Sequence, residues 1–135
     1  MLYLGTETNK MKKVISTQNA PAAIGPYSQG ILSGNTLYCS GQIAINPATG
    51  DLVMDNITAE TTQVMQNIAA VLKEADMDFS NVVKCSIFMK SMDDYTEINK
   101  VYGEYFSNNP PAREAVQVSV LPKNVNVEIS VIAVK

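Results

Sequence analysis

Hydrophobic residues along this chain follow two periods, one typical of strands and one typical of helices. Residues 12–17 predict a short strand, and residues 28–41 contain two apolar runs separated by Gly34-Asn35. Both residues of this pair tolerate positive φ, so the segment predicts a tight β-hairpin. Residues 81–90 carry apolar side chains on both faces, which is typical of a central strand.

Two other segments follow the helical period of about 3.6 residues. Residues 58–75 predict a helix with Thr58 as its N-terminal cap. Residues 91–106 predict a second helix that opens at Ser91 and ends before the Asn-Asn-Pro-Pro sequence at 108–111. The residues expected to face inward are Val64, Ile68, Val71, Leu72 and Ala75 in the first helix, and Ile98, Val101, Tyr102, Tyr105 and Phe106 in the second.

The C-terminal segment completes the order of elements. Residues 110–130 contain two β-branched runs around Pro122-Lys123 and predict a closing hairpin. The order of strands and helices is therefore β-β-β-α-β-α-β-β, an α+β fold with a six-stranded mixed sheet and two helices on one face. Since two helices cover only one face, we predict that another copy of the chain covers the other.

Composition limits the class of protein. The chain has 135 residues, 46% of them apolar and 17% charged, which is typical of one globular domain. We expect that domain to span residues 11–135, because residues 1–10 resemble a detachable leader, either an upstream start or an expression remnant. No apolar stretch reaches membrane-spanning length and no signal peptide is evident, so we expect a cytoplasmic protein without membrane contact.

Charge and residue types exclude several kinds of site. The net charge is −3 and the pI is about 4.8, which disfavours nucleic acid as a partner. The chain has no histidine, and its two cysteines, Cys39 and Cys85, lie in apolar strand-like runs. These features exclude zinc-finger, histidine-metal and Ser-His-Asp sites. We expect no metal and no cofactor, and we expect both thiols to be buried and reduced.

Two charged residues interrupt the β-branched runs of the closing hairpin. Arg113 points away from the valine residues of its strand, which we expect to lie under the helices. Glu128 points away from the valine and isoleucine residues of the last strand. Alternation therefore places Arg113 and Glu128 together on the face without helices, in a polar pocket between copies of the chain. The plainer alternative is a cross-strand ion pair exposed to water.

The expected distance between Arg113 and Glu128 does not decide whether the two side chains contact each other. A simple hairpin about Pro122-Lys123 pairs Gln117 with Glu128, and Arg113 then lies about 13 Å further along its strand. Direct pairing requires the side chains to lean together or a bulge to intervene. Otherwise a small ligand bridges them, or a neighbouring copy completes the site.

Four separated segments resemble one known family. They are "NAPAAIGPYSQG", "LYCSGQIAINPATG", "PPAREAVQV" and "LPKNVNVEISVIAV", and they follow one another between residues 11 and 135. Together they are similar to the Rid (YjgF-type) enamine/imine deaminases, some of which carry older labels as endoribonucleases or translation inhibitors. The resemblance implies a chorismate-mutase-like fold in which three subunits form a central barrel, with ligand clefts between neighbours.

The resemblance also implies roles for individual residues. Arg113 of "PPAR" would hold a substrate carboxylate, and Glu128 of "VEI" would position water or the substrate nitrogen. Tyr27 of "GPYSQG" would line the cleft, and Ser40 and Gly41 of "SGQ" would form its wall. Read without the resemblance, the tyrosine can equally pack within its loop, and the serine-glycine pair can simply end a strand.

Two further positions come from the same resemblance. Asn99 of "EINKVYG" would lie near the mouth of the substrate-binding cleft, although it can also be an ordinary exposed helix residue. Ala115 would also contact the substrate, and it stands where many relatives have a cysteine. We therefore expect no thiol-dependent step.

The predicted function is that of a 2-iminobutanoate/2-iminopropanoate deaminase. Such an enzyme hydrolyses reactive enamine/imine intermediates from pyridoxal-phosphate-dependent dehydratases to 2-keto acids and ammonia. A guanidinium that holds the carboxylate and a carboxylate that orders water suffice for this reaction. Two alternatives remain: a ribonuclease or translation inhibitor, and a protein that binds 2-keto acids without turnover. The expected partners are small 2-imino and 2-keto acids and sister chains in a homotrimer.

Overall fold

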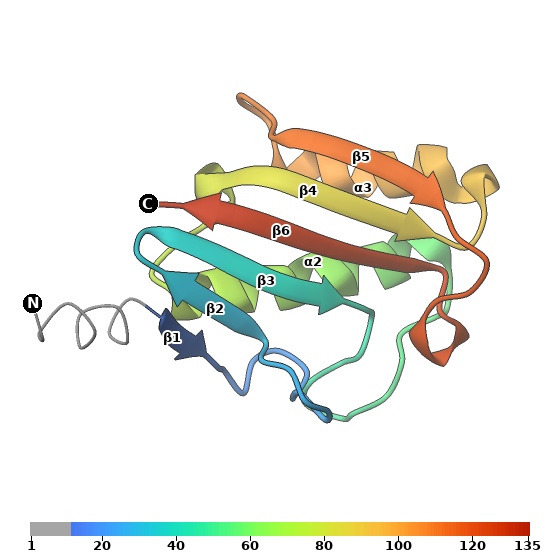
Figure 1. Ribbon diagram of the computed structural model, residues 1–135. Coiled ribbons are helices and arrows are strands. Elements are labelled where there is room, and N and C mark those ends of the chain that lie inside the picture. The colour runs from blue at the N-terminus through green and yellow to red at the C-terminus, as the bar shows by residue number, and fades with distance from the viewer. Residues whose placement is uncertain (1–11) are drawn as a thin grey trace, which may run out of the picture.

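The computed structural model describes residues 12–135 as a sheet covered on one face by two helices (Figure 1). The strands are β1 (Lys12–Ile15), β2 (Gly30–Ser33), β3 (Thr36–Gln42), β4 (Val82–Met89), β5 (Ala112–Gln117) and β6 (Val127–Val134). The helices are α2 (Ile57–Glu74) and α3 (Tyr95–Tyr105), with short 3-10 turns at Phe79–Asn81, Met92–Asp94 and Pro122–Asn124. The predicted order of elements is confirmed, whereas the leader predicted at residues 1–10 lies outside the described residues.

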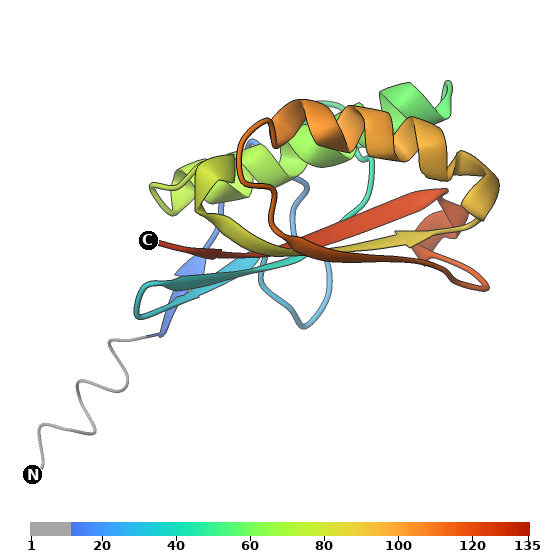
Figure 2. The same ribbon diagram turned by 90° about the horizontal axis from the view of Figure 1, so that it is seen from above.

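The sheet places its strands in the order β1-β2-β3-β6-β4-β5. Every neighbouring pair is antiparallel except β4 with β5, which is parallel. Helix α2 connects β3 to β4 and helix α3 connects β4 to β5, and both helices lie on the same face (Figure 2). The prediction of an α+β fold with a six-stranded mixed sheet and two helices on one face is therefore confirmed.

Local signals in the sequence account for the turn and the helix start that frame this sheet. Gly34 adopts a φ of 59° in the two-residue turn between β2 and β3, as its hairpin requires. Helix α2 is capped by Asn56 and not by Thr58 as predicted, because the Asn56 side chain accepts a hydrogen bond of 2.8 Å from the amide of Ala59. Within residues 12–135, no helix combines the length and hydropathy needed to cross a membrane.

One hydrophobic core fills the space between the sheet and the helices. Both predicted helical stripes contribute to it, although Tyr105 and Phe106 are only half-buried. Cys39 and Cys85 are also in the core and are not joined by a disulfide, as predicted. Burial raises the pKa of the Cys39 thiol to about 12 and also raises that of Cys85, so both thiols are protonated at neutral pH.

The predicted closing hairpin is wrong. Strands β5 and β6 do not pair with each other; they lie on either side of β4. The connection between them, residues 118–126, contains a 3-10 turn and passes round the end of β4 instead of reversing tightly. As a result Gln117 pairs with Met89, and the expected Gln117–Glu128 pairing does not form.

The predicted face of β5 is wrong as well. Arg113 is in register with the buried Cys85, so it points to the helix side, while Val116 on the opposite face is 41% exposed. Glu128 alternates with the buried residues of β6 and therefore points to the open face, as predicted. Arg113 and Glu128 thus lie on opposite faces of the sheet. The reason is that β5 is an edge strand whose helix side is covered by polar and aromatic residues of α3, not by the centre of the core.

Candidate functional site

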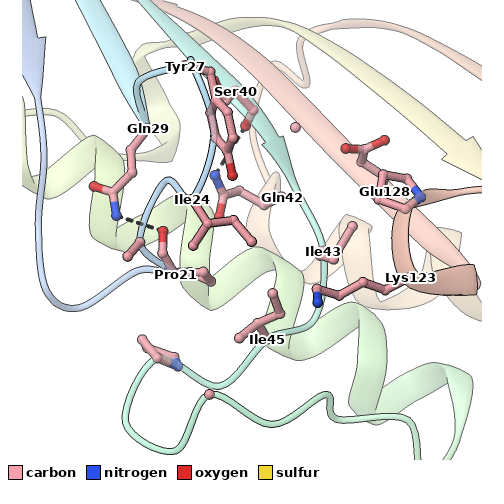
Figure 3. A pocket seen from close by; sticks show the side chains of 15 residues that line it. Pro21, Ile24, Tyr27, Gln29, Ser40, Gln42, Ile43, Ile45, Lys123 and Glu128 are labelled. Carbon is pink, nitrogen blue, oxygen red and sulfur yellow. Dashed lines mark hydrogen bonds between the residues drawn. The ribbon is translucent and has the colours of Figure 1, made fainter.

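All predicted site residues except Ala115 fall into two separate hollows. The first, which we call the Glu128 pocket, has a volume of about 670 Å³ and includes Tyr27, Ser40, Gly41 and Glu128 in its lining. Figure 3 shows the side chains of Tyr27, Ser40 and Glu128 around one hollow, which the apolar side chains of Ile24, Ile43 and Ile45 also line. The second, which we call the Arg113 pocket, has a volume of about 410 Å³ and is lined by Asn99, Tyr102, Gly103, Phe106, Pro110, Pro111 and Arg113.

Partly buried hydrogen bonds hold the loop that carries Tyr27. The side chain of Gln29 accepts a hydrogen bond of 2.7 Å from the amide of Thr17 and donates one of 2.8 Å to the carbonyl of Pro21. The Ser40 hydroxyl donates a hydrogen bond of 2.6 Å to the carbonyl of Ser28, next to Tyr27. The bonds of Gln29 attach the loop to the residue before β2, and the bond of Ser40 attaches it to β3. Ser40 therefore shapes the pocket by fixing the backbone beside the tyrosine.

Gly41 allows the Glu128 carboxylate to approach the β3 backbone. A Cβ atom added at Gly41 would lie 2.5 Å from Oε2 and 2.9 Å from Cδ of Glu128. The glycine therefore does more than end a strand: β3 continues to Gln42, with an irregular register between Cys39 and Gln42. Only a residue without a side chain leaves the carboxylate in its observed position.

The Glu128 carboxylate lies in a partly apolar setting without a bound partner. Its side chain is half-buried, and within residues 12–135 no hydrogen bond or ion pair reaches its oxygens. Burial raises the pKa of Glu128 above the usual value for a glutamate. Such a carboxylate can accept a proton from water and return it to a reaction intermediate.

The Arg113 guanidinium is held by neutral groups of α3. Its Nη1 donates a hydrogen bond of 2.6 Å to Oδ1 of Asn99, and its Nη2 donates one of 2.8 Å to the hydroxyl of Tyr95. Its Cζ also lies 4.8 Å from the centre of the Tyr102 ring. Among the described residues, no carboxylate forms an ion pair with this guanidinium. The one ion pair in this part of the chain joins Lys84 to Glu114 and does not involve Arg113. The remaining N–H groups can therefore bind an external anion.

Sequence patterns did not single out three residues that line these hollows or contact Arg113. Tyr95 and Tyr102 contact Arg113 although the sequence suggested only that Tyr102 was buried. Lys123 adds a cation to the Glu128 pocket from the turn before β6, where its φ is 54°. Ala115, predicted to contact substrate, packs against the core and lines neither pocket. The available signal for Lys123 was its place after a proline in "LPKN", which is typical of a turn.

The fold and sequence define the class of protein to which this chain belongs. The family model described as Endoribonuclease L-PSP matches residues 17–135. Among solved structures, YyfA of the conserved Rid protein family from Yersinia pestis has a TM-score of 0.90 and 50% identity, over 92% of this chain and 99% of that chain. The protein therefore belongs to the endoribonuclease L-PSP family, in which the Rid proteins are found, as the sequence motifs predicted.

Two other relatives have names that mention small molecules. A protein of Bos taurus named 2-iminobutanoate/2-iminopropanoate deaminase is 47% identical over 125 residues, which cover 93% of this chain and 91% of the relative. TdcF of E. coli, solved with bound serine, has a TM-score of 0.88 and 37% identity over 92% of this chain and 99% of that chain.

Proposed function

We propose that this protein is a cytoplasmic deaminase that hydrolyses 2-iminobutanoate and 2-iminopropanoate to 2-keto acids and ammonia. The observation that carries the proposal is the Arg113 guanidinium, which is oriented by neutral acceptors and has no carboxylate partner among the described residues. Such a group suits the planar carboxylate of a 2-imino acid. The deaminase relative from cattle and the serine bound to TdcF support the same class of ligand.

We propose further that the complete site forms between copies of the chain in a homotrimer. Arg113 and Glu128 point to opposite faces of one sheet, so a single chain cannot present both to one small molecule. The open face also exposes apolar residues, among them Tyr38 at 51% and Val116 at 41%. Packing of this face against a second copy would bury them and would bring the β5 edge of one chain to the Glu128 pocket of the next.

The reaction needs orientation and proton transfer and no covalent nucleophile. The enamine first tautomerises to the imine, and protonation of the imine nitrogen makes the adjacent carbon electrophilic. Arg113 would hold the carboxylate, while Glu128 would accept a proton from the water whose oxygen bonds to that carbon. Glu128 would return that proton to the nitrogen of the resulting carbinolamine. The C–N bond would then break as the hydroxyl group loses its proton to Glu128 and becomes the carbonyl, and the 2-keto acid and ammonia would leave.

The test is keto-acid release while a serine/threonine dehydratase generates the intermediate in situ. We expect the wild-type protein to accelerate release of pyruvate and 2-ketobutyrate, and Glu128→Gln to lose about 10²–10⁴-fold of that acceleration. Absence of acceleration by the wild-type trimer would refute the proposal. Calorimetric binding of 2-ketobutyrate without acceleration would instead favour a binding protein, and RNA cleavage lost in Arg113→Ala would favour a ribonuclease.

The pH dependence of the reaction is expected to report the environment of Glu128. The carboxylate acts as a base only when ionised, so kcat/KM should fall as the pH is lowered through its pKa. Because burial raises that pKa, the fall should begin at a higher pH than the ordinary glutamate value of about 4.3 would give. A pH–rate profile checks this, and an acidic limb that is unchanged in Glu128→Gln would contradict the assignment.

Gly41→Ala is expected to lower catalytic activity strongly while lowering the stability of the fold only slightly. The added Cβ would displace the end of the Glu128 side chain, which is flexible, so we expect a stability loss of about 1 kcal/mol or less. A carboxylate displaced by about 1 Å is expected to lower kcat/KM by about 10²-fold. Thermal unfolding and the dehydratase-coupled assay measure the two effects, and unchanged activity would mean that the position of the carboxylate is unimportant.

A further inference from the structure

Tyr95 occupies a position that links the Arg113 strand to the start of α3. The helix begins at Tyr95, directly after the 3-10 turn whose first residue is Met92. The amide of Met92 donates a hydrogen bond of 2.8 Å to Oε1 of Gln117, at the end of β5. Four residues earlier on this strand, Nη2 of Arg113 donates to the Tyr95 hydroxyl. Strand β5 and the start of α3 are thus joined at two points along the strand.

The tyrosine is well suited to hold a guanidinium without neutralising it. Its ring is partly buried against the core, which restricts its rotation, and its centre lies 5.7 Å from Cζ of Arg113. A guanidinium only donates hydrogen bonds, so the hydroxyl oxygen must accept, and the amide of Asn99 must present its oxygen. A carboxylate in either position would instead form an ion pair and compete with an external anion.

We propose that Tyr95 is a positioning residue for Arg113. Its hydroxyl fixes the rotation of the guanidinium, so that the N–H groups not bound to Asn99 or Tyr95 face the carboxylate of the substrate. The identity of that substrate rests on the proposed function. The fixed orientation of the guanidinium is independent of the proposed function, because the hydrogen bonds that produce this orientation lie within one chain.

Nuclear magnetic resonance of the arginine side chain tests the orientation directly. Arg113 is the only arginine in the chain, so its Nε and Nη signals need no separate assignment. We expect slow rotation and separate Nη signals in the wild type, and rotation at least about tenfold faster in Tyr95→Phe, which keeps the ring and removes the hydroxyl. Tyr105→Phe is the matched control, since Tyr105 lies on the same helix, its ring packs at a tilt against Phe79, and it takes no part in the hydrogen bonds of Arg113. Freely rotating wild-type Nη groups, or equal rotation rates in wild type and Tyr95→Phe, would overturn the proposal.

Enzyme kinetics test the consequence for substrate. Weaker fixation of the carboxylate is a loss of uniform binding, so Tyr95→Phe should raise KM about tenfold and leave kcat within about twofold. The dissociation constant of 2-ketobutyrate should rise by the same factor, equal to about 1.4 kcal/mol. A purely structural role would lower the melting temperature and leave KM unchanged, which would refute the positioning role. An inactive wild type would refute the proposed function, while the resonance result would still decide the role of Tyr95.

Discussion

Arg113→Ala is expected to abolish most of the catalytic acceleration while leaving the fold intact. Two hydrogen bonds from the guanidinium to a substrate carboxylate are each worth about 1.5–3 kcal/mol, so we expect kcat/KM to fall by about 10²–10⁴-fold. The fold should tolerate the change because Arg113 lies half-buried on an edge strand, where water can reach the groups it leaves behind. The dehydratase-coupled assay measures the rate, and analytical ultracentrifugation shows whether assembly is retained.

Two companion variants identify which property of Arg113 matters. Arg113→Lys keeps the charge but loses the planar fork, and we expect it to recover only a small part of the activity. Lys84→Ala is the matched control, because it removes an exposed cation from the neighbouring strand. The ion pair of Lys84 with Glu114 is expected to contribute less than about 1 kcal/mol to stability. An Arg113→Ala protein that assembles normally and retains full activity would exclude Arg113 from the site.

Glu60→Ala is expected to produce the largest loss of stability among the predicted variants. Glu60 is fully buried in the first turn of α2. Its two carboxylate oxygens accept hydrogen bonds of 2.8 Å each from the backbone amide and the side-chain amide of Asn126. Removing the carboxylate leaves both N–H groups without an acceptor, at about 1–3 kcal/mol for each such group. We therefore expect the free energy of unfolding to fall by about 3 kcal/mol.

Chemical denaturation checks this value against a control on the other helix. Glu97→Ala removes an exposed glutamate from the first turn of α3, and it should change the free energy of unfolding by less than about 0.5 kcal/mol. Because Asn126 directly precedes the strand that carries Glu128, Glu60→Ala should also lower activity at temperatures where the protein remains folded. A Glu60→Ala protein as stable as the Glu97→Ala protein would show that these hydrogen bonds contribute little.

The sequence alone predicted the elements that depend on short-range patterns. Periodicity placed both helices within a few residues, and the Gly34-Asn35 pair located the tight hairpin. Such signals are readable because neighbouring residues create them: an apolar stripe recurs every turn, and a two-residue turn needs a residue that tolerates positive φ. The resemblance of the motifs around Tyr27, Ser40 and Gly41 to a known family implied that these residues line a cleft, and all three line the Glu128 pocket.

Strand pairing and the surroundings of Arg113 were decided only in three dimensions. Alternation shows that Arg113 and Val116 point to opposite faces of β5, but it does not show which face the helices cover. That choice depends on β4 lying between β5 and β6, and therefore on a connection long enough to pass round the end of β4. The sequence by itself determined the helices and strands and indicated candidate residues for a site. The tertiary structure decided their neighbours, because contacts between strands and helices far apart in the chain set which side chains share a pocket.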